Sequence, residues 1–211
     1  MKKRILALIL VAAFALAGCG ISKPNAELDK ITSEITTGQN DSTENASSAG
    51  ESAETDTEDS AEEEYYLTFT ATTTDGGTWS SDNFTNSKLT MINIWGTYCN
   101  PCLSEMPDLG EIAGEYDAAD FQLIGIICDV MEGDSEDTVE NAKSLIEETQ
   151  ANYPHLLLNE ELYVNLVGAV SAVPTTFFVG QDGAVMGYLT GAQSKENWKS
   201  LIDQLLAEIE Q

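Results

Sequence analysis

The sequence predicts an α/β fold in which a mixed central sheet is flanked by helices and preceded by an extra N-terminal β-hairpin. Two near-continuous apolar runs of strand length, KLTMINIW at 88–95 and FQLIGIICDV at 121–130, are typical of strands covered on both faces. Helix-like segments follow each run, and a hairpin signal stands near each end of the region 65–211. This order of elements indicates a mixed sheet between helices.

The other elements follow from local signals. Asp75-Gly76-Gly77 between β-rich arms indicates a hairpin turn, and Pro101 suits the first turn of a helix, where its missing N–H is not needed. The expected elements are a hairpin over 65–80, a helix over 102–116, a helix over 135–150, a strand over 155–159, a helix over 160–168, a second hairpin over 175–191 and a final helix over 194–211. Right-handed crossovers place the strand over 88–95 centrally, so that its carboxyl end delivers the segment GTYCNPC to a helix N-terminus.

The beginning of the chain is typical of an export signal. A basic start, MKKR, precedes an apolar run of 13 residues, which is shorter than the roughly 20 residues that span a bilayer as a helix. Leu16-Ala17-Gly18-Cys19 resembles a bacterial lipoprotein box, which implies cleavage before Cys19 and a lipid on its thiol. We expect a signal peptide over 1–18 and a protein lipid-anchored at the extracytoplasmic face of the cell membrane; the alternative is an ordinary secreted protein.

Residues 19–64 differ from the rest in composition. They contain no aromatic residue, few large aliphatic residues and a surplus of carboxylates, so they cannot bury enough apolar surface to fold. We expect a disordered acidic linker that leads to a single domain over 65–211. That domain carries 23 carboxylate side chains against four lysines, and such a balance argues against binding to nucleic acid.

The motif CNPC places Cys99 and Cys102 three positions apart. A zinc site needs four ligands, and beyond this pair the domain offers only Cys128 and His155, so we expect no metal. A structural disulfide across so short a loop would restrict the unfolded chain little. At a strand-to-helix turn, however, the helix N-terminus favours a thiolate at Cys99, while Cys102 lies one turn later within disulfide reach. The geometry therefore favours a redox dithiol with Cys99 exposed and Cys102 more buried.

The segments WGTYCNPC and VPTTF resemble motifs of the thioredoxin superfamily. The resemblance covers the whole of residues 65–211. The resemblance implies a thioredoxin-like fold in which Pro174 is cis and packs against the dithiol, and in which Val173 pairs with an extended substrate. We expect Trp95, Tyr98 and Pro101 to lie at the surface around Cys99 and to contact substrate.

Further residues are similar to the TlpA/ResA-like extracytoplasmic thiol-disulfide oxidoreductases, with a domain of the AhpC/TSA-Redoxin type. Asn93 replaces the aspartate that cytoplasmic thioredoxins carry six positions before the first cysteine, and Glu105 stands three residues after Cys102. In that family the glutamate lies close to the dithiol, where it can raise thiol pKa values and transfer protons. The alternative for Glu105 is a solvated carboxylate on the helix face. Tyr98 departs from the tryptophan usual at this place.

The resemblance implies an enzyme that exchanges disulfides with exported client proteins and needs no bound cofactor beyond the Cys99–Cys102 disulfide. A membrane electron donor of the CcdA/DsbD type would reduce it. Negative surroundings and the absence of a positive charge between the cysteines favour a reductase, serving cytochrome c maturation or a methionine sulfoxide reductase. The alternatives are an oxidase or isomerase of exported disulfides and a non-catalytic lipoprotein binding module.

Two further residues have open roles. Cys128 is expected to be a buried strand residue that behaves as a small hydrophobe, although its place near the end of a strand also fits a third redox thiol. His155 is expected at a strand edge rather than in catalysis.

Overall fold

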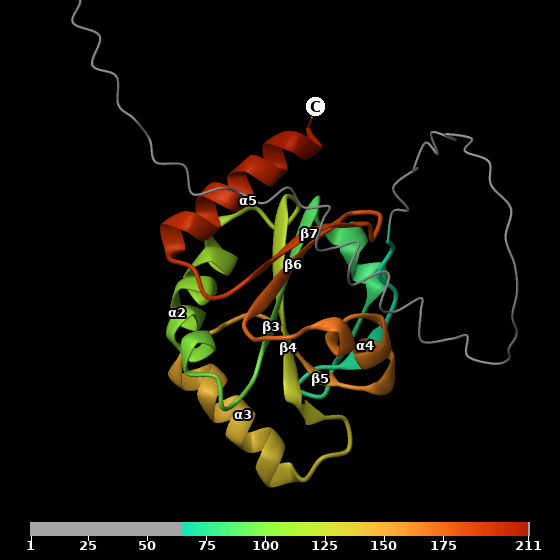
Figure 1. The fold of residues 1–211 in the computed structure, drawn as a ribbon, viewed down its shortest axis with the longest axis vertical. Coiled ribbons are helices and arrows are strands. Elements are labelled where there is room, and N and C mark those ends of the chain that lie inside the picture. The colour runs from blue at the N-terminus through green and yellow to red at the C-terminus, as the bar shows by residue number, and fades with distance from the viewer. Residues whose placement is uncertain (1–64, 211) are drawn as a thin grey trace, which may run out of the picture.

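Five strands form the central sheet of the computed structural model, which describes residues 65–210. The predicted signal peptide and linker, including Cys19, and the last residue lie outside the described residues. The sheet has the order β5-β4-β3-β6-β7 (Figure 1). The strands are β3 (Leu89–Trp95), β4 (Phe121–Met131), β5 (His155–Leu158), β6 (Thr175–Gly180) and β7 (Val185–Thr190).

Strand directions make the sheet mixed. Strands β3, β4 and β5 run parallel to one another, whereas β6 pairs antiparallel with β3 and with β7. The central place of β3 and the antiparallel hairpin formed by β6 and β7 confirm the predicted mixed sheet. Since β3 is buried along its whole length, its near-continuous apolar sequence is explained by cover on both faces.

Helices cover both faces of this sheet. Figure 1 shows α2, α3 and α5 on one side, and α4 with the N-terminal part of the domain on the other. The helices are α2 (Asn100–Glu115), α3 (Glu136–Glu148), α4 (Glu160–Asn165) and α5 (Lys195–Ile209). Over residues 65–210, no helix combines the length and apolar character that crossing a membrane requires.

The predicted N-terminal hairpin forms a small separate sheet of β1 (Thr70–Thr72) and β2 (Thr78–Ser80). The short 3-10 helix η1 (Ser81–Asn86) follows it, and Trp79 and Phe84 pack with it against the central sheet. The thioredoxin-like fold with an extra N-terminal hairpin is therefore confirmed.

Two apolar cores lie on the two faces of the sheet, and β3 contributes to both by strict alternation. Met91 and Trp95 face the core shared with α2 and α5, while Ile92 and Ile94 face the core shared with the hairpin and α4. Asn93 lies on the same face as Met91 and Trp95 and introduces a polar group into that core.

The helix expected over 160–168 is divided in the structure. Helix α4 ends at Asn165, and Gly168 lies in the 3-10 turn η2 (Val167–Ala169). At Gly168 a Cβ atom would lie 2.8 Å from the carbonyl oxygen of Tyr163. The tight turn thus brings two backbone segments together at a place where a larger residue would collide.

Candidate active site

The two cysteines of CNPC form a disulfide at the junction of β3 and α2. Their Cα atoms are 5.3 Å apart and the S–S distance is 2.04 Å. Cys99 is the N-cap of α2, and Pro101 occupies the first turn, as the sequence predicts. The backbone N–H of Cys102 donates to Cys99 Sγ over 3.2 Å. A free helix N–H therefore points at the sulfur, and in the reduced protein this contact favours a thiolate at Cys99.

Cys99 is more exposed than Cys102, as predicted, but it is much less exposed than expected. Cys99 exposes 5% of its surface and Cys102 none. The expectation of an exposed Cys99 is therefore wrong in degree, because the loop before β6 packs over its sulfur. Tyr98 and Pro101, close to Cys99 in sequence, are exposed.

The segment before β6 meets the disulfide from the other side. The Val173–Pro174 peptide bond is cis, as the resemblance implies, and the carbonyl oxygen of Val173 lies 3.7 Å from Cys99 Sγ. The backbone N–H of Gly191 donates to the Pro174 carbonyl over 2.8 Å, and Thr175 Oγ1 donates to the Ala172 carbonyl over 2.7 Å. These bonds fix the segment, so Val173 presents its backbone beside the sulfur.

Glu105 is buried beneath the disulfide, with only 3% of its surface exposed. It lies one helical turn after Cys102 on the buried face of α2. Asn93 Nδ2 donates to its Oε1 over 3.1 Å. The backbone N–H of Gln193 and Trp198 Nε1 donate to its Oε2, over 3.1 Å and 3.3 Å. The alternative of a solvated carboxylate is therefore excluded.

Opposing effects act on the pKa of Glu105. Burial is the largest and raises the pKa, while the three hydrogen bonds lower it; the net direction is upward. Cys102 is one helical turn away. An ionised Glu105 therefore disfavours a thiolate on the dithiol, and a neutral Glu105 holds a proton close to the dithiol.

A small groove of about 120 Å³ opens beside Tyr98 and Val173. Its walls are mostly apolar and contain the one free cysteine among residues 65–210, Cys128, at 3.9 Å from the hydroxyl of Tyr98. Cys128 is half-buried rather than buried, and this burial raises the pKa of its thiol. The lining residues are Ile94, Tyr98, Cys128, Val167, Val170, Ser171, Ala172 and Val173.

The expectation for Trp95 is wrong. Its side chain is completely buried, and its Nε1 donates to His155 Nδ1 over 3.1 Å. The position just before the active-site loop suggested a surface residue, but β3 is covered on both faces up to its end.

His155 lies in the edge strand β5 and contacts the Ala151 carbonyl with its other nitrogen. Burial lowers the pKa of His155 to about 4, so the ring is neutral at physiological pH.

Several residues of the site were not predicted from the sequence. Trp198 is one of them, and its Nε1 donates to Glu105 Oε2. Thr176, opposite Asn93 in the β3–β6 register, accepts a hydrogen bond from its amide. Asp129 accepts from the backbone and side chain of Thr97 and so fixes the loop before Cys99. Polar residues inside otherwise apolar strands are the signal that could have indicated Asn93 and Thr176.

Fold and site together define a class. A mixed sheet, a helix that begins at a CxxC disulfide and a cis-proline segment beside its first sulfur make this a thioredoxin-fold protein with an intact cysteine pair. Within that class, the chain belongs to the AhpC/TSA family, whose model matches residues 64–187.

Curated relatives carry the name thiol-disulfide oxidoreductase ResA. The protein of Bacillus anthracis is 25% identical over 114 residues, which are 54% of this chain and 61% of the relative. That of Geobacillus kaustophilus is 28% identical over 106 residues, 50% of this chain and 56% of the relative. The chain thus spans about three fifths of the length of the curated relatives it matches.

Solved structures of similar proteins share the fold. A thiol:disulfide interchange protein of Chlorobium tepidum has a TM-score of 0.58 at 24% identity, covering 68% of this chain and 97% of its own. The exposed lipoprotein thioredoxin Etrx1 of Streptococcus pneumoniae has a TM-score of 0.54 at 21% identity, covering 65% of this chain and 99% of its own.

Proposed function

We propose that this protein is a thiol-disulfide oxidoreductase that reduces disulfides of exported client proteins. The observation that carries the proposal is the position of Cys99 Sγ, at the N-terminus of α2 and 3.7 Å from the Val173 carbonyl of the cis-proline segment. An extended client strand that pairs with the backbone of Val173 would bring its own sulfur to Cys99. The name shared by the curated relatives supports the same activity.

In the proposed exchange the two cysteines are the redox groups. In the reduced protein, the Cys99 thiolate attacks one sulfur of a client disulfide, which forms a mixed disulfide and releases the other client sulfur as a thiolate. Cys102 then loses its proton and attacks Cys99 Sγ. This step releases the second client thiolate and forms the Cys99–Cys102 disulfide. Two electrons pass to the client, and protons neutralise its two thiolates. Glu105 would take the proton of Cys102.

The charges near the pair support the proposed direction of exchange. Buried Glu105 stands one turn from Cys102, and the residues between the cysteines, Asn100 and Pro101, carry no positive charge. A stabilised thiolate makes a dithiol oxidising, so surroundings that disfavour the thiolate favour the reductase. The alternative, an oxidase or isomerase of exported disulfides, requires a Cys99 thiolate stabilised further than by the helix N–H that contacts its sulfur.

Location and partners extend the same proposal. A lipid on Cys19 would anchor the protein at the extracytoplasmic face, as the word lipoprotein in the name of the pneumococcal Etrx1 suggests by analogy. Oxidised protein there would be reduced by a membrane electron donor of the CcdA/DsbD type. Cytochrome c maturation and methionine sulfoxide reductase are the client systems proposed.

The groove beside Tyr98 and Val173, about 120 Å³ in volume, would take a small apolar side chain of the client.

Trapping of the mixed disulfide tests the proposal. In a Cys102→Ser variant the second step cannot occur, so client proteins should accumulate in covalent complexes with Cys99. The complexes are detected in cells as bands of higher mass on non-reducing gels that disappear on reduction. The Cys99→Ser variant is the matched control and should trap far fewer clients, because Cys102 is completely buried. Absence of complexes in the Cys102→Ser cells would contradict the proposal.

A further inference from the structure

Three donors surround the carboxylate of Glu105, and they do not act alike. Asn93 donates to Oε1, whereas Gln193 and Trp198 both donate to Oε2. The Asn93 amide can turn by 180° and offer an acceptor instead, since its Oδ1 has no hydrogen-bond partner among the described residues. A backbone N–H and an indole N–H are donors only. A proton on Glu105 would therefore reside on Oε1, and the two donors on Oε2 favour the ionised form.

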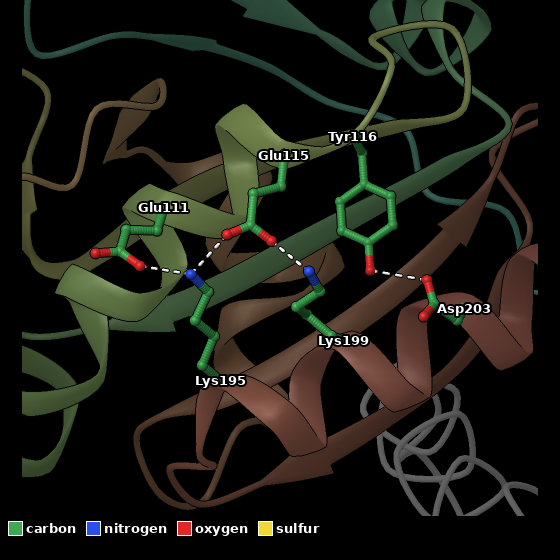
Figure 2. A network of polar contacts seen from close by, with 6 residues as sticks. All are labelled: Glu111, Glu115, Tyr116, Lys195, Lys199 and Asp203. Atoms are coloured by element: carbon green, nitrogen blue, oxygen red, sulfur yellow. Dashed lines mark hydrogen bonds and ion pairs between the residues drawn. The ribbon is translucent and has the colours of Figure 1, made fainter.

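Helix α5 carries the indole donor, and two lysines hold this helix against α2. Figure 2 shows Lys195 between Glu111 and Glu115, and Lys199 beside Glu115. Farther along the same contact, Tyr116 donates to Asp203 over 2.9 Å. Trp198 lies between the two lysines in sequence, and its side chain is completely buried. The ion pairs thus fix the helix that places the indole N–H on Glu105.

We propose that Trp198 is a positioning residue, which holds the carboxylate of Glu105 in place behind the Cys99–Cys102 pair and favours its ionised form. The inference rests on the proposed function in giving that carboxylate a role in exchange. Without the indole, Oε2 would keep one donor, the N–H of Gln193, in a site that burial already makes unfavourable for a charge.

The other titratable groups near Glu105 do not stabilise its charge. Asp108, on α2 itself, raises the pKa of Glu105 by charge repulsion. Tyr153, which precedes β5, is buried, and burial followed by the charge of Glu105 raises its pKa; Tyr153 is therefore neutral wherever Glu105 titrates. Cys99 and Cys102 are joined in the oxidised protein and do not titrate. Asn93 and Thr176, from β3 and β6, are uncharged, so none of these neighbours supplies a positive charge.

The test is a pH titration of the Glu105 carboxyl carbon by 13C NMR in the oxidised protein, with the signal assigned by its loss in Glu105→Gln. In Trp198→Phe, which keeps an aromatic ring and removes the N–H, the midpoint should move to higher pH. Trp79→Phe is the matched control and should leave it unchanged, since Trp79 lies in the core on the opposite face of the sheet. An unchanged midpoint in Trp198→Phe would overturn the inference.

A second measurement needs no substitution at Trp198. The chain has three tryptophans, so its indole N–H signals can be assigned with Trp79→Phe and Trp95→Phe. The Trp198 signal should shift with the same midpoint as Glu105 and lose this shift in Glu105→Gln; a pH-independent signal would overturn the inference. Both readouts use the oxidised protein without a client. A failure of the proposed function appears separately, as absence of trapped complexes in Cys102→Ser.

Discussion

Among residues 65–210, Glu105 is the one buried carboxylate. An ion held away from water costs several kcal/mol unless hydrogen bonds replace its hydration, and here three donors do so. A site of this kind is retained where the charge has a use. We propose that the charge of Glu105 controls the protonation of the nearby dithiol, which no apolar replacement could supply.

His155 gives a prediction for stability as a function of pH. Burial lowers the pKa of His155 from 6.5 to about 4, so the unfolded chain binds a proton between these pH values and the folded protein does not. The contribution of His155 to the free energy of unfolding should therefore fall by about 3 kcal/mol as pH drops from 6.5 to 4. Below pH 4 this contribution should change no further.

Urea denaturation at a series of pH values checks this prediction, with His155→Gln as the control. The variant keeps a polar side chain near Trp95 Nε1 but does not titrate, so the difference between the two stability curves isolates His155. Parallel curves from pH 7 to pH 4 would show that His155 does not remain neutral in the folded protein.

At the scale of the elements, helix α2, which carries Cys102 and Glu105, packs closely on the segment before β5. At Gly110 an added Cβ would lie 2.2 Å from the carbonyl oxygen of Gln150, whereas at Gly114 it would meet nothing within 4 Å. Gly110→Ala should therefore destabilise the protein by about 1–3 kcal/mol through overpacking. Gly114→Ala should stabilise it by up to about 1 kcal/mol through helix propensity.

Thermal or urea unfolding of the two variants measures these opposite signs within one helix. If Gly110→Ala proved as stable as Gly114→Ala, the close contact between α2 and Gln150 would be refuted.

The elements themselves were largely predictable. Continuous apolar runs indicated β3 and β4, and Ser135 and Ser194 cap α3 and α5 as local rules require. The position of the CNPC motif at a helix start was predictable, because it needs only a strand-to-helix turn. The cis bond before Pro174 was predictable, because this proline stands in a recognisable motif.

Tertiary contacts limited what could be predicted of the site. The bond between Trp198 and Glu105 joins residues 93 positions apart, and no local pattern encodes it. Trp95 was misplaced for a related reason: a strand covered on both faces carries no polar alternation that would show which side chain reaches the surface.

At the scale of the whole molecule, the net charge of −27 affects how the protein can attach to a membrane. Such a chain is repelled by anionic lipid head groups, so attachment to a membrane would depend on the proposed lipid at Cys19. Cys19→Ala should therefore move the protein from the membrane fraction of the host cells to the soluble fraction. Immunoblotting of the fractions checks this, with Cys128→Ala as the control; membrane-bound Cys19→Ala protein would contradict the lipid anchor.

The redox midpoint of the Cys99–Cys102 pair tests the central claim most directly. Equilibration of the purified protein in thiol-disulfide buffers of known potential, with alkylation of free thiols read by mass, gives this value. A pair set beside buried Glu105 and without a neighbouring positive charge should be reducing, with a midpoint of about −270 mV. A midpoint of about −120 mV would contradict the account, because the protein would then oxidise the clients that it is proposed to reduce.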